Sequence, residues 1–300
     1  MLKRWPDTKY RDWYLGDWLA PMGVDAGNQA SVDLVSNCFI SECLSTMYKT
    51  AITLGKREEA EEFAIRREKL NKLIHQTFYR VDEGIYSTGS QLDMCYPMLV
   101  GVVPDSLYNK VKENVVAMTE EKYKGHIAVG LVGVPILTEW AVRNKQVDFF
   151  YQMMKKRDYP GYLYMIDHGA TATWEYWSGE RSRVHNCYNG IGTWFYQAVG
   201  GIRLDEAKPG YRHFYVDPQI PNGVTWTKVT KESPYGTIAV NWELQGKQLN
   251  LQLIVPAGTT ATVCIPNNAV SCKMNKKKVS IKKQTVDVEA GHYDFLFNLK

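Results

Sequence analysis

The sequence predicts two domains in series: helical hairpins that stack into a toroid, followed by an all-β sandwich. Apolar residues recur at helical spacing through roughly the first two thirds of the chain, and short alternating runs follow Gly201. Short links between successive helices force neighbouring helices to run antiparallel. We therefore expect a helical domain over residues 1–204 and a β-domain over residues 205–300.

The composition fits a folded protein and excludes several classes of function. Hydrophobic residues make up 45% and charged residues 23% of the 300 residues, which is ordinary for a globular protein. The net charge of +4 is too small to indicate a nucleic acid partner. No apolar run reaches the length of about 18 residues that a membrane span needs. The six cysteines form no CxxC pair, so we expect no metal site and no dense disulfide framework.

The helical domain is expected to begin with a pair of long helices. Residues 31–54 carry apolar side chains at helical spacing and end before Gly55, and a second helix follows over residues 58–78. Because residues 31–54 and 131–142 are apolar over more than one face, we expect an exposed apolar patch. Five further helices are expected, over residues 92–102, 105–118, 131–142, 147–154 and 188–199.

The β-domain is expected to contain short strands with period-2 alternation, separated by proline, glycine and asparagine turns. Its basic cluster, residues 273–283, alternates lysine with valine and isoleucine, which is typical of an edge strand that charge protects from pairing. The expected strands are residues 214–216, 224–229, 237–242, 249–254, 260–265, 279–281, 286–288 and 292–297.

Three loops of the helical domain combine polar groups, aromatic rings and glycines: residues 14–19, 125–130, and 167–177 with 183–186. Aromatic faces pack well against the C–H faces of sugars. Glu175 lies among Trp174, Tyr176 and Trp177, where desolvation can tune the pKa of its carboxyl group. Glycosidases need two carboxyl groups, one acid and one base or nucleophile, and Glu175 is the best candidate for one of them.

A purely structural interpretation of the same residues stays open. Glu175 could cap a helix or pair with Arg181 or Arg183, and Trp174 and Trp177 could be core residues. Asp17 could equally be a helix cap or a turn residue, and His185 a cap or a buried, satisfied histidine. His126 alone indicates little.

The strings GYLYMIDHGATATWEYW and RVHNCYNGIGTWFYQAVGGI, with GDWLAP and GHIAVGLVG upstream in the same order, resemble the bacterial α-L-rhamnosidases of glycoside hydrolase family 78. The resemblance covers nearly all of residues 12–204, and the rest is similar to the C-terminal β-sandwich domain of that family. It implies an (α/α)6 toroid of six hairpins, followed by an antiparallel β-sandwich. It also implies hydrolysis of terminal α-L-rhamnose with inversion, without a metal or other cofactor.

The resemblance implies a role for each candidate residue. Glu175 matches the general base that activates water, and His185 matches a histidine that contacts the sugar beside that base. Trp18 matches a tryptophan that walls the sugar pocket, and Asp17 and His126 match positions that shape it. Trp174 and Trp177 flank the base and are expected to bind substrate. The expected partner is a rhamnose-containing glycan or glycoside.

The general acid of the family lies in a motif of the form DERxGWxGD, which this chain lacks. We therefore expect the chain to be the C-terminal part of a catalytic domain, with about four of six hairpins, and to be inactive alone. Two alternatives are another six-hairpin glycosidase, acting on glucosidic or uronic-acid linkages, and a carbohydrate-binding protein without catalysis. The first residues lack the apolar stretch of a secretory signal. A periplasmic or extracellular location of the full-length protein stays open, as does the oligomeric state.

Overall fold

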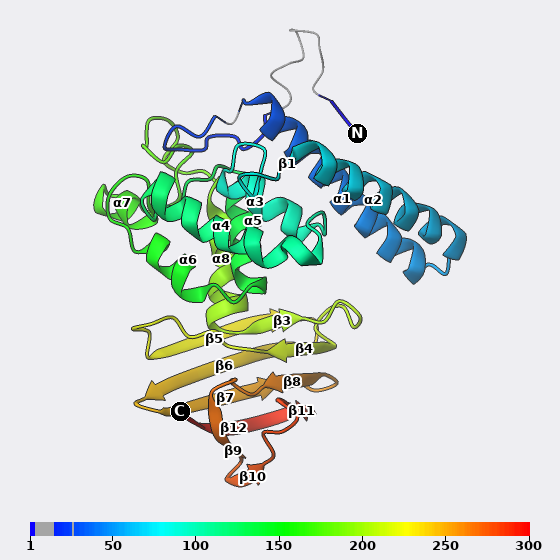
Figure 1. The fold of residues 1–300 in the computed structure, drawn as a ribbon. Helices are drawn as coiled ribbons and strands as arrows, with labels where there is room; N and C mark the ends of the chain where they lie inside the picture. Colours follow the sequence, from blue (N-terminus) through cyan, green and yellow to red (C-terminus); the bar gives the residue numbers. More distant parts are fainter. Residues whose placement is uncertain (4–14, 26) are drawn as a thin grey trace. The chain divides into compact units, whose positions relative to one another are not determined.

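The computed structural model of the chain describes residues 1–3, 15–25 and 27–300. The chain divides into two compact units, one formed by residues 1–144 and 149–191, the other by residues 145–148 and 192–300. Figure 1 shows helices in the first unit and strands in most of the second.

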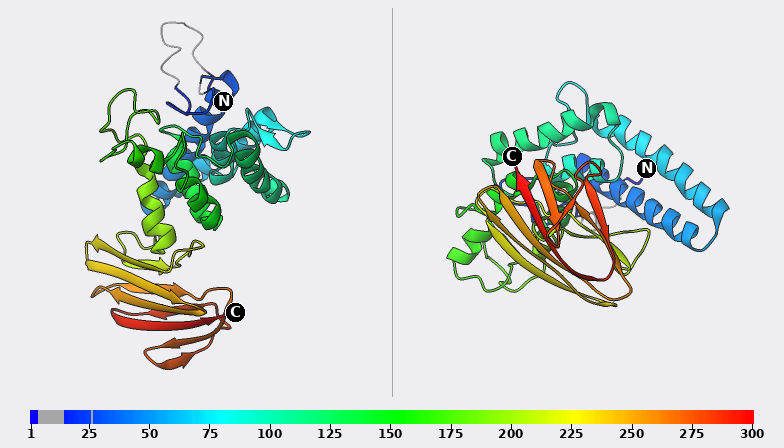
Figure 2. Two further views of the ribbon diagram at one scale, coloured as in Figure 1. Left: turned by 90° about the vertical axis from the view of Figure 1, so that its left-hand side faces the viewer. Right: turned by 90° about the horizontal axis from the view of Figure 1, so that it is seen from below.

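The first unit opens with an antiparallel helical hairpin, α1 (Gln29–Thr53) and α2 (Arg57–Phe78), whose helices lie side by side in Figures 1 and 2. The Asn28 side chain caps α1 by accepting hydrogen bonds from the backbone N–H groups of Ala30 and Ser31. Gly55, with a φ of +73°, allows the tight turn between the helices. The first helix pair is therefore confirmed as predicted.

Five more helices and a small hairpin complete the pattern of this region. The helices are α3 (Gln91–Leu99), α4 (Asp105–Tyr123), α5 (Gly133–Arg143), α6 (Val147–Met154) and α7 (Tyr162–Asp167). The hairpin pairs β1 (Tyr79–Arg80) with β2 (Ile85–Tyr86). Helix α7 and this hairpin were not predicted, because both are too short to show a period.

The two helices expected to be apolar on several faces differ in the structure. In α1, Phe39, Met47 and Ile52 are exposed, as expected. In α5, by contrast, Leu137 and Trp140 are buried. Helix α5 is apolar because neighbouring elements cover it, whereas α1 keeps part of its apolar surface open. Among the described residues, no helix is both long enough and apolar enough to cross a membrane.

The 3-10 turn η2 (Asn189–Ile191) is the last element of the first unit. In the second unit, α8 (Gly192–Trp194) and the π-helical η3 (Phe195–Val199) lead into a β-sandwich. The strands are β3 (Ile202–Leu204), β4 (His213–Val216), β5 (Trp226–Ser233), β6 (Gly236–Gln245), β7 (Gln248–Val255), β8 (Thr260–Cys264), β9 (Ala269–Met274), β10 (Lys277–Val279), β11 (Thr285–Val288) and β12 (Gly291–Leu299). Strand β3 lies in this compact unit, and the domain boundary expected after residue 204 stays a prediction.

The strands form a six-stranded sheet, β10-β9-β12-β7-β6-β5, and a four-stranded sheet, β11-β8-β4-β3. Figure 2 shows the strands of the larger sheet side by side. Pairing is antiparallel except between β4 and β8, which run parallel. Strict alternation in β7 buries Leu249, Leu251 and Leu253 and exposes the residues between them. The fold is therefore the predicted one: helical hairpins followed by a largely antiparallel sheet-rich domain.

Two details of the sandwich bear on the sequence predictions. The lysine-rich strand β10 is an edge strand, as expected, but it ends at Val279, and residues 280–284 turn away before β11. The strand predicted over residues 279–281 is therefore wrong beyond its first residue. All six cysteines are free thiols, including Cys264 and Cys272.

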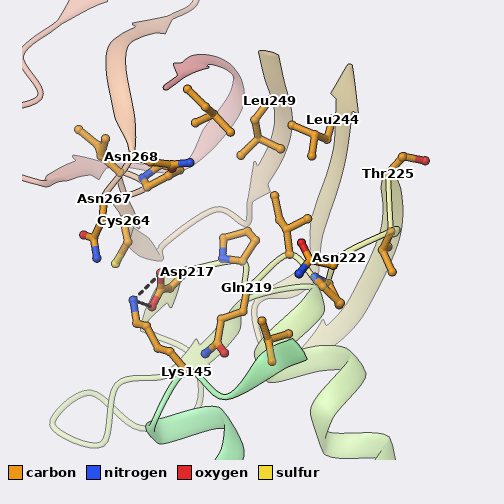
Figure 3. Close-up of a pocket in the computed structure, with 18 of the residues that line it drawn as sticks. Lys145, Asp217, Gln219, Asn222, Thr225, Leu244, Leu249, Cys264, Asn267 and Asn268 are labelled. Atoms are coloured by element: carbon orange, nitrogen blue, oxygen red, sulfur yellow. Dashed lines mark hydrogen bonds and ion pairs between the residues drawn. The ribbon is translucent and has the colours of Figure 1, made fainter. Parts of the chain in front are cut away.

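A cavity of about 580 Å³ opens at one end of the sandwich. Figure 3 shows carboxamide side chains around it, together with the ion pair in which Lys145 Nζ lies 3.1 Å from Asp217 Oδ2. Apolar side chains such as Leu244 and Leu249 line its inner part. None of the residues predicted to bind substrate lines this cavity, so it is separate from the site described next.

Candidate active site

The strongest candidate site lies where the three loops singled out in the sequence meet in the helical unit. Gly130 lies so close to the first loop that a Cβ there would be 2.1 Å from the carbonyl oxygen of Trp18. The same carbonyl accepts a 2.8 Å hydrogen bond from the Leu131 N–H. Glycine is therefore required at residue 130 by this close approach of two backbones. Tyr14, at the start of the first loop, lies outside the described residues.

Asp17 joins the first two loops by its side chain. Its two carboxylate oxygens accept hydrogen bonds from the backbone N–H groups of Gly130 (2.8 Å) and Gly133 (2.7 Å), the latter at the start of α5. Burial raises the pKa of Asp17 from 3.8 to about 7, although these two N–H groups act in the opposite direction. Asp17 thus caps α5 from a distant part of the chain. Because both carboxylate oxygens accept these backbone hydrogen bonds, Asp17 holds the first two loops together as a buried support.

The third loop is held by two buried aromatic rings. The Trp177 indole N–H donates a 2.9 Å hydrogen bond to the Val129 carbonyl oxygen, which ties the third loop to the second. Tyr188 stacks on Trp177 with ring centroids 4.2 Å apart. The Tyr188 hydroxyl lies 3.1 Å from the carbonyl oxygens of both Leu19 and Glu175. Trp177 and Tyr188 therefore form the packed support on which the three loops meet.

Glu175 lies on a short hairpin within the third loop. Its backbone N–H donates to the Ser182 carbonyl oxygen (2.9 Å), and the His185 N–H donates to the Thr173 carbonyl oxygen (2.8 Å). The Thr173 hydroxyl closes the hairpin by donating to the His185 carbonyl oxygen (2.5 Å). These bonds fix the backbone on both sides of Glu175, so that its carboxylate is presented from a defined position.

The carboxylate of Glu175 is partly exposed and has few partners. Among the described residues it accepts a single hydrogen bond, a long one of 3.4 Å from the Ser182 N–H. The two neighbouring arginines, which could have neutralised it, lie over aromatic rings: Arg181 over Tyr176 at 5.3 Å and Arg183 over Trp174 at 5.1 Å. Within the part of the chain that the structure describes, Glu175 forms no ion pair. The carboxylate therefore keeps its capacity to accept a proton or a hydrogen bond from a ligand.

His185 lies close to Glu175 in the same hairpin and is partly buried. Its Nδ1 accepts a hydrogen bond from the Cys187 N–H (3.1 Å), which places the ring proton on Nε2. Burial and the nearby Glu175 carboxylate together raise the pKa of the Cys187 thiol. The hairpin therefore places an N–H donor and a carboxylate acceptor in the same neighbourhood.

The remaining candidates divide into buried supports and one exposed ring. His126 is buried, with Nδ1 2.8 Å from the Pro160 carbonyl oxygen and Nε2 3.2 Å from Asp158 Oδ2. Trp174 is buried beneath Arg183. Trp18, in contrast, is 40% exposed, and so its indole can face a ligand. Of the candidates, Trp18 is exposed and Glu175 and His185 are partly exposed, whereas Asp17, His126, Trp174 and Trp177 are buried.

Two further supporting residues, Gln91 and Tyr162, are not among the site residues predicted from the sequence. Gln91 accepts a hydrogen bond from the Ala128 N–H (2.8 Å) and donates one to the His126 carbonyl oxygen (2.9 Å), so it holds the second loop. Tyr162 donates to the Tyr188 carbonyl oxygen (2.9 Å), behind the third loop. Neither residue stands out from its neighbours in the sequence. Only the hydrogen bonds that Gln91 and Tyr162 make to distant residues reveal that they support the loops.

Comparison with known proteins defines the class first. The helical unit belongs to the class of six-hairpin glycosidase domains. Residues 1–199 match the family described as the bacterial α-L-rhamnosidase six-hairpin glycosidase domain, and residues 201–280 match the bacterial α-L-rhamnosidase C-terminal domain. The chain belongs to this α-L-rhamnosidase family, as the resemblance in its sequence predicted.

Individual relatives agree. The chain is 28% identical to an α-L-rhamnosidase of Formosa agariphila, over 93% of this chain and 32% of the relative, and 26% identical to one of Alteromonas sp. over the same shares. It is similar in fold to a Streptomyces avermitilis α-L-rhamnosidase complexed with L-rhamnose, with a TM-score of 0.84 and 23% identity over 94% of this chain and 28% of that one. A Dictyoglumus thermophilum α-L-rhamnosidase gives a TM-score of 0.86, with 21% identity over 97% of this chain and 35% of that one. The chain therefore spans about a third of the length of these relatives.

Proposed function

We propose that this chain carries the water-activating side of an inverting glycoside hydrolase that releases terminal α-L-rhamnose from glycans or glycosides. Glu175 acts as the general base in this proposal. The observation that carries it is the state of the Glu175 carboxylate: partly exposed, held by a fixed hairpin, and free of the arginines beside it. A structural glutamate at this place would pair with Arg181 or Arg183 instead.

The proposed step needs a water molecule beside the anomeric carbon of the sugar. The Glu175 carboxylate takes a proton from that water as the oxygen attacks, while a general acid protonates the departing oxygen on the opposite face of the ring. His185 donates its Nε2 proton to a sugar hydroxyl, and Trp18 offers an aromatic face to the C–H groups of the ring. Because the chain lacks a DERxGWxGD motif, the general acid in this proposal comes from sequence outside these 300 residues.

The remaining site residues have supporting roles in the proposal. Asp17 and His126 hold the first two loops, and Trp174 and Trp177 hold the third, so that the accessible groups keep their relative positions. A displacement of about 1 Å at a catalytic group can reduce turnover by roughly a hundredfold. Substitution of these four residues is therefore expected to lower turnover through position rather than through direct contact with the sugar.

The test uses the whole product of the reading frame that carries this chain, alongside the 300-residue chain itself. Glu175→Gln keeps the size and hydrogen bonding of the side chain but removes the base, and turnover of nitrophenyl α-L-rhamnoside is expected to fall by roughly 100-fold or more. The affinity for rhamnose should change little. The matched control is Glu180→Gln, an exposed glutamate five residues further along the same loop, which should retain activity.

Three outcomes would contradict the proposal. Full turnover by Glu175→Gln would remove Glu175 from the chemistry. Faster cleavage of nitrophenyl glucosides or glucuronides than of rhamnosides would assign a different substrate to the same site. Rhamnose binding without hydrolysis by the whole gene product would leave a carbohydrate-binding protein without catalysis.

A further inference from the structure

The outward face of the larger sheet in the β-sandwich carries an ordered set of polar side chains with one aromatic ring. Two cross-strand rows define this outward face. In the first row, Trp226 of β5 pairs with Glu243 of β6, which pairs with Asn250 of β7. Residues that pair directly across antiparallel strands point to the same side of the sheet. The second row, on the same side, is Lys228, Asn241, Gln252 and Asp294.

The side of the sheet on which these rows lie follows from the alternation of buried and exposed residues. Asn250 and Gln252 alternate in β7 with the buried Leu249, Leu251 and Leu253, which fill the inside of the sandwich. The rows therefore lie on the opposite, solvent-facing side. Neighbouring strands are about 4.8 Å apart, so the second row extends over roughly 14 Å from β5 to β12. That is longer than a single sugar ring.

Trp226 is the most unusual residue of this outward face. It is 63% exposed, whereas Trp194 and Trp242, the two other tryptophans of this unit, are fully buried. The Trp242 indole N–H is also bonded, to the Val199 carbonyl oxygen at 2.8 Å. The sandwich thus uses its other indoles for packing and leaves one on the surface, where it contributes little to stability. An exposed indole beside ordered polar groups is suited to ligand contact.

The polar groups around Trp226 are available for ligand hydrogen bonds. The side chains of Asn241 and Asn250 have no hydrogen-bond partner among the described residues, and Gln252 makes one long bond of 3.4 Å to Asp294. Together with Lys276, the rows line a hollow of about 580 Å³. Its charged lining residues are balanced, with Lys228 and Lys276 against Glu243 and Asp294, which disfavours a strongly charged ligand.

The end cavity of the same sandwich has a different character. It has a similar volume, but none of the described residues that line it is aromatic, and its charged groups, Lys145 and Asp217, are already paired. Figure 3 shows that pair between two carboxamide clusters. A sugar ring would find hydrogen-bonding groups there but no flat aromatic surface. The outward face offers both.

We propose that the outward face of the β5-β6-β7-β12 sheet is a second carbohydrate-binding site, which takes a neutral oligosaccharide. One sugar ring packs on the Trp226 indole, and the hydroxyl groups of that ring and its neighbours bond to Asn241, Asn250 and Gln252. This goes beyond the proposed function, because binding here does not need Glu175. The site would hold the enzyme on a polymeric substrate.

The test measures binding and turnover separately. Binding is measured by calorimetry in a Glu175→Gln background, with a neutral rhamno-oligosaccharide, a cello-oligosaccharide and an oligogalacturonate as probes. Because Glu175→Gln is expected to retain rhamnose affinity, the rhamno-oligosaccharide should bind at two sites in this background, one of them the outward face. Trp226→Ala should weaken binding of the neutral probes at the outward face by about tenfold or more, and the acidic probe should bind there more weakly. Asn241→Ala should weaken it by a smaller factor. The matched control, Thr230→Ala, changes an exposed residue further along β5 and should leave binding unchanged.

Turnover supplies the second readout. With intact Glu175, Trp226→Ala should leave hydrolysis of nitrophenyl rhamnoside unchanged but raise the KM for a rhamnose-containing polymer. If Glu175→Gln retained turnover while Trp226→Ala still weakened binding, the proposed function would fail and the second site would stand. In the Glu175→Gln background, neutral probes that bind with the same number of sites and the same affinities whether or not Trp226→Ala is present would overturn the second site. So would absence of binding combined with a dimer that Trp226→Ala dissociates, since the outward face would then be an interface between copies.

Discussion

The three loops that meet at the candidate active site, here called the loop cluster, and the outward face of the sandwich both offer aromatic rings and polar groups. The two regions are built in opposite ways. In the loop cluster, the indole of Trp177 is buried as a support, and the accessible Glu175 depends on contacts between distant loops. On the outward face, Trp226 itself is exposed, and strand register alone aligns its neighbours. Substitutions should therefore affect folding in the first region and mainly ligand binding in the second.

Paired glycine substitutions give the largest expected difference. Gly130→Ala would place a Cβ 2.1 Å from the Trp18 carbonyl oxygen, and because both atoms belong to backbones, neither can move away easily. We expect a loss of about 3 kcal/mol in the free energy of unfolding, with a loss of activity. Gly192→Ala, in α8, meets nothing within 4 Å and should be neutral or slightly stabilising. Urea unfolding of both variants measures the free energy of unfolding. Equal midpoints for Gly130→Ala and Gly192→Ala would contradict the expected difference between the two positions.

A paired tryptophan substitution tests the supports directly. Trp177→Phe removes the hydrogen bond to the Val129 carbonyl oxygen and leaves a small cavity beside Tyr188. The expected cost is about 2 kcal/mol, together with lower turnover. Trp226→Phe, made in the exposed position, should change the free energy of unfolding by less than about 0.5 kcal/mol. A cost at Trp226 as large as that at Trp177 would mean that the outward face is held by packing rather than open to ligand.

The pH dependence of stability separates the two regions in a third way. Because burial raises the pKa of Asp17 from 3.8 to about 7, the folded chain keeps this proton over a range in which the unfolded chain releases it. The contribution of Asp17 to stability is therefore fully present below about pH 4 and is lost as the pH rises towards 7. Melting temperatures of wild type and Asp17→Asn should converge over this range. The exposed Asp294→Asn is the matched control, and a constant difference at Asp17 would contradict the expectation.

Much of the fold could be predicted from the sequence, because periodicity is a local property. The α1–α2 hairpin and the alternation of β7 follow directly from the spacing of apolar residues. The strand predicted over residues 279–281 was wrong because alternating lysines continue past Val279, where the chain turns. Short elements such as α7 have too few residues to show a period.

The site could be predicted only as a set of candidates. Sequence analysis left open whether Glu175 pairs with Arg181 or Arg183, since one loop brings all three together. The structure places both arginines over aromatic rings, a choice that depends on side-chain packing. Asp17 reaches Gly133 across 116 residues of sequence, and no local pattern reveals a contact of that range. The residues proposed to act on substrate were therefore easier to find than those that hold them in place.

Strand β12 has a consequence for how the sandwich assembles. It lies between β7 and β9, so it alone joins the β5-β6-β7 meander to the β9–β10 hairpin. Both of those parts are local and can form early, whereas the pairing of β12 with β7 closes a long loop. We therefore expect sandwich folding to be limited by docking of residues 291–299, with two half-sheets and their open edges exposed to aggregation until that step is complete.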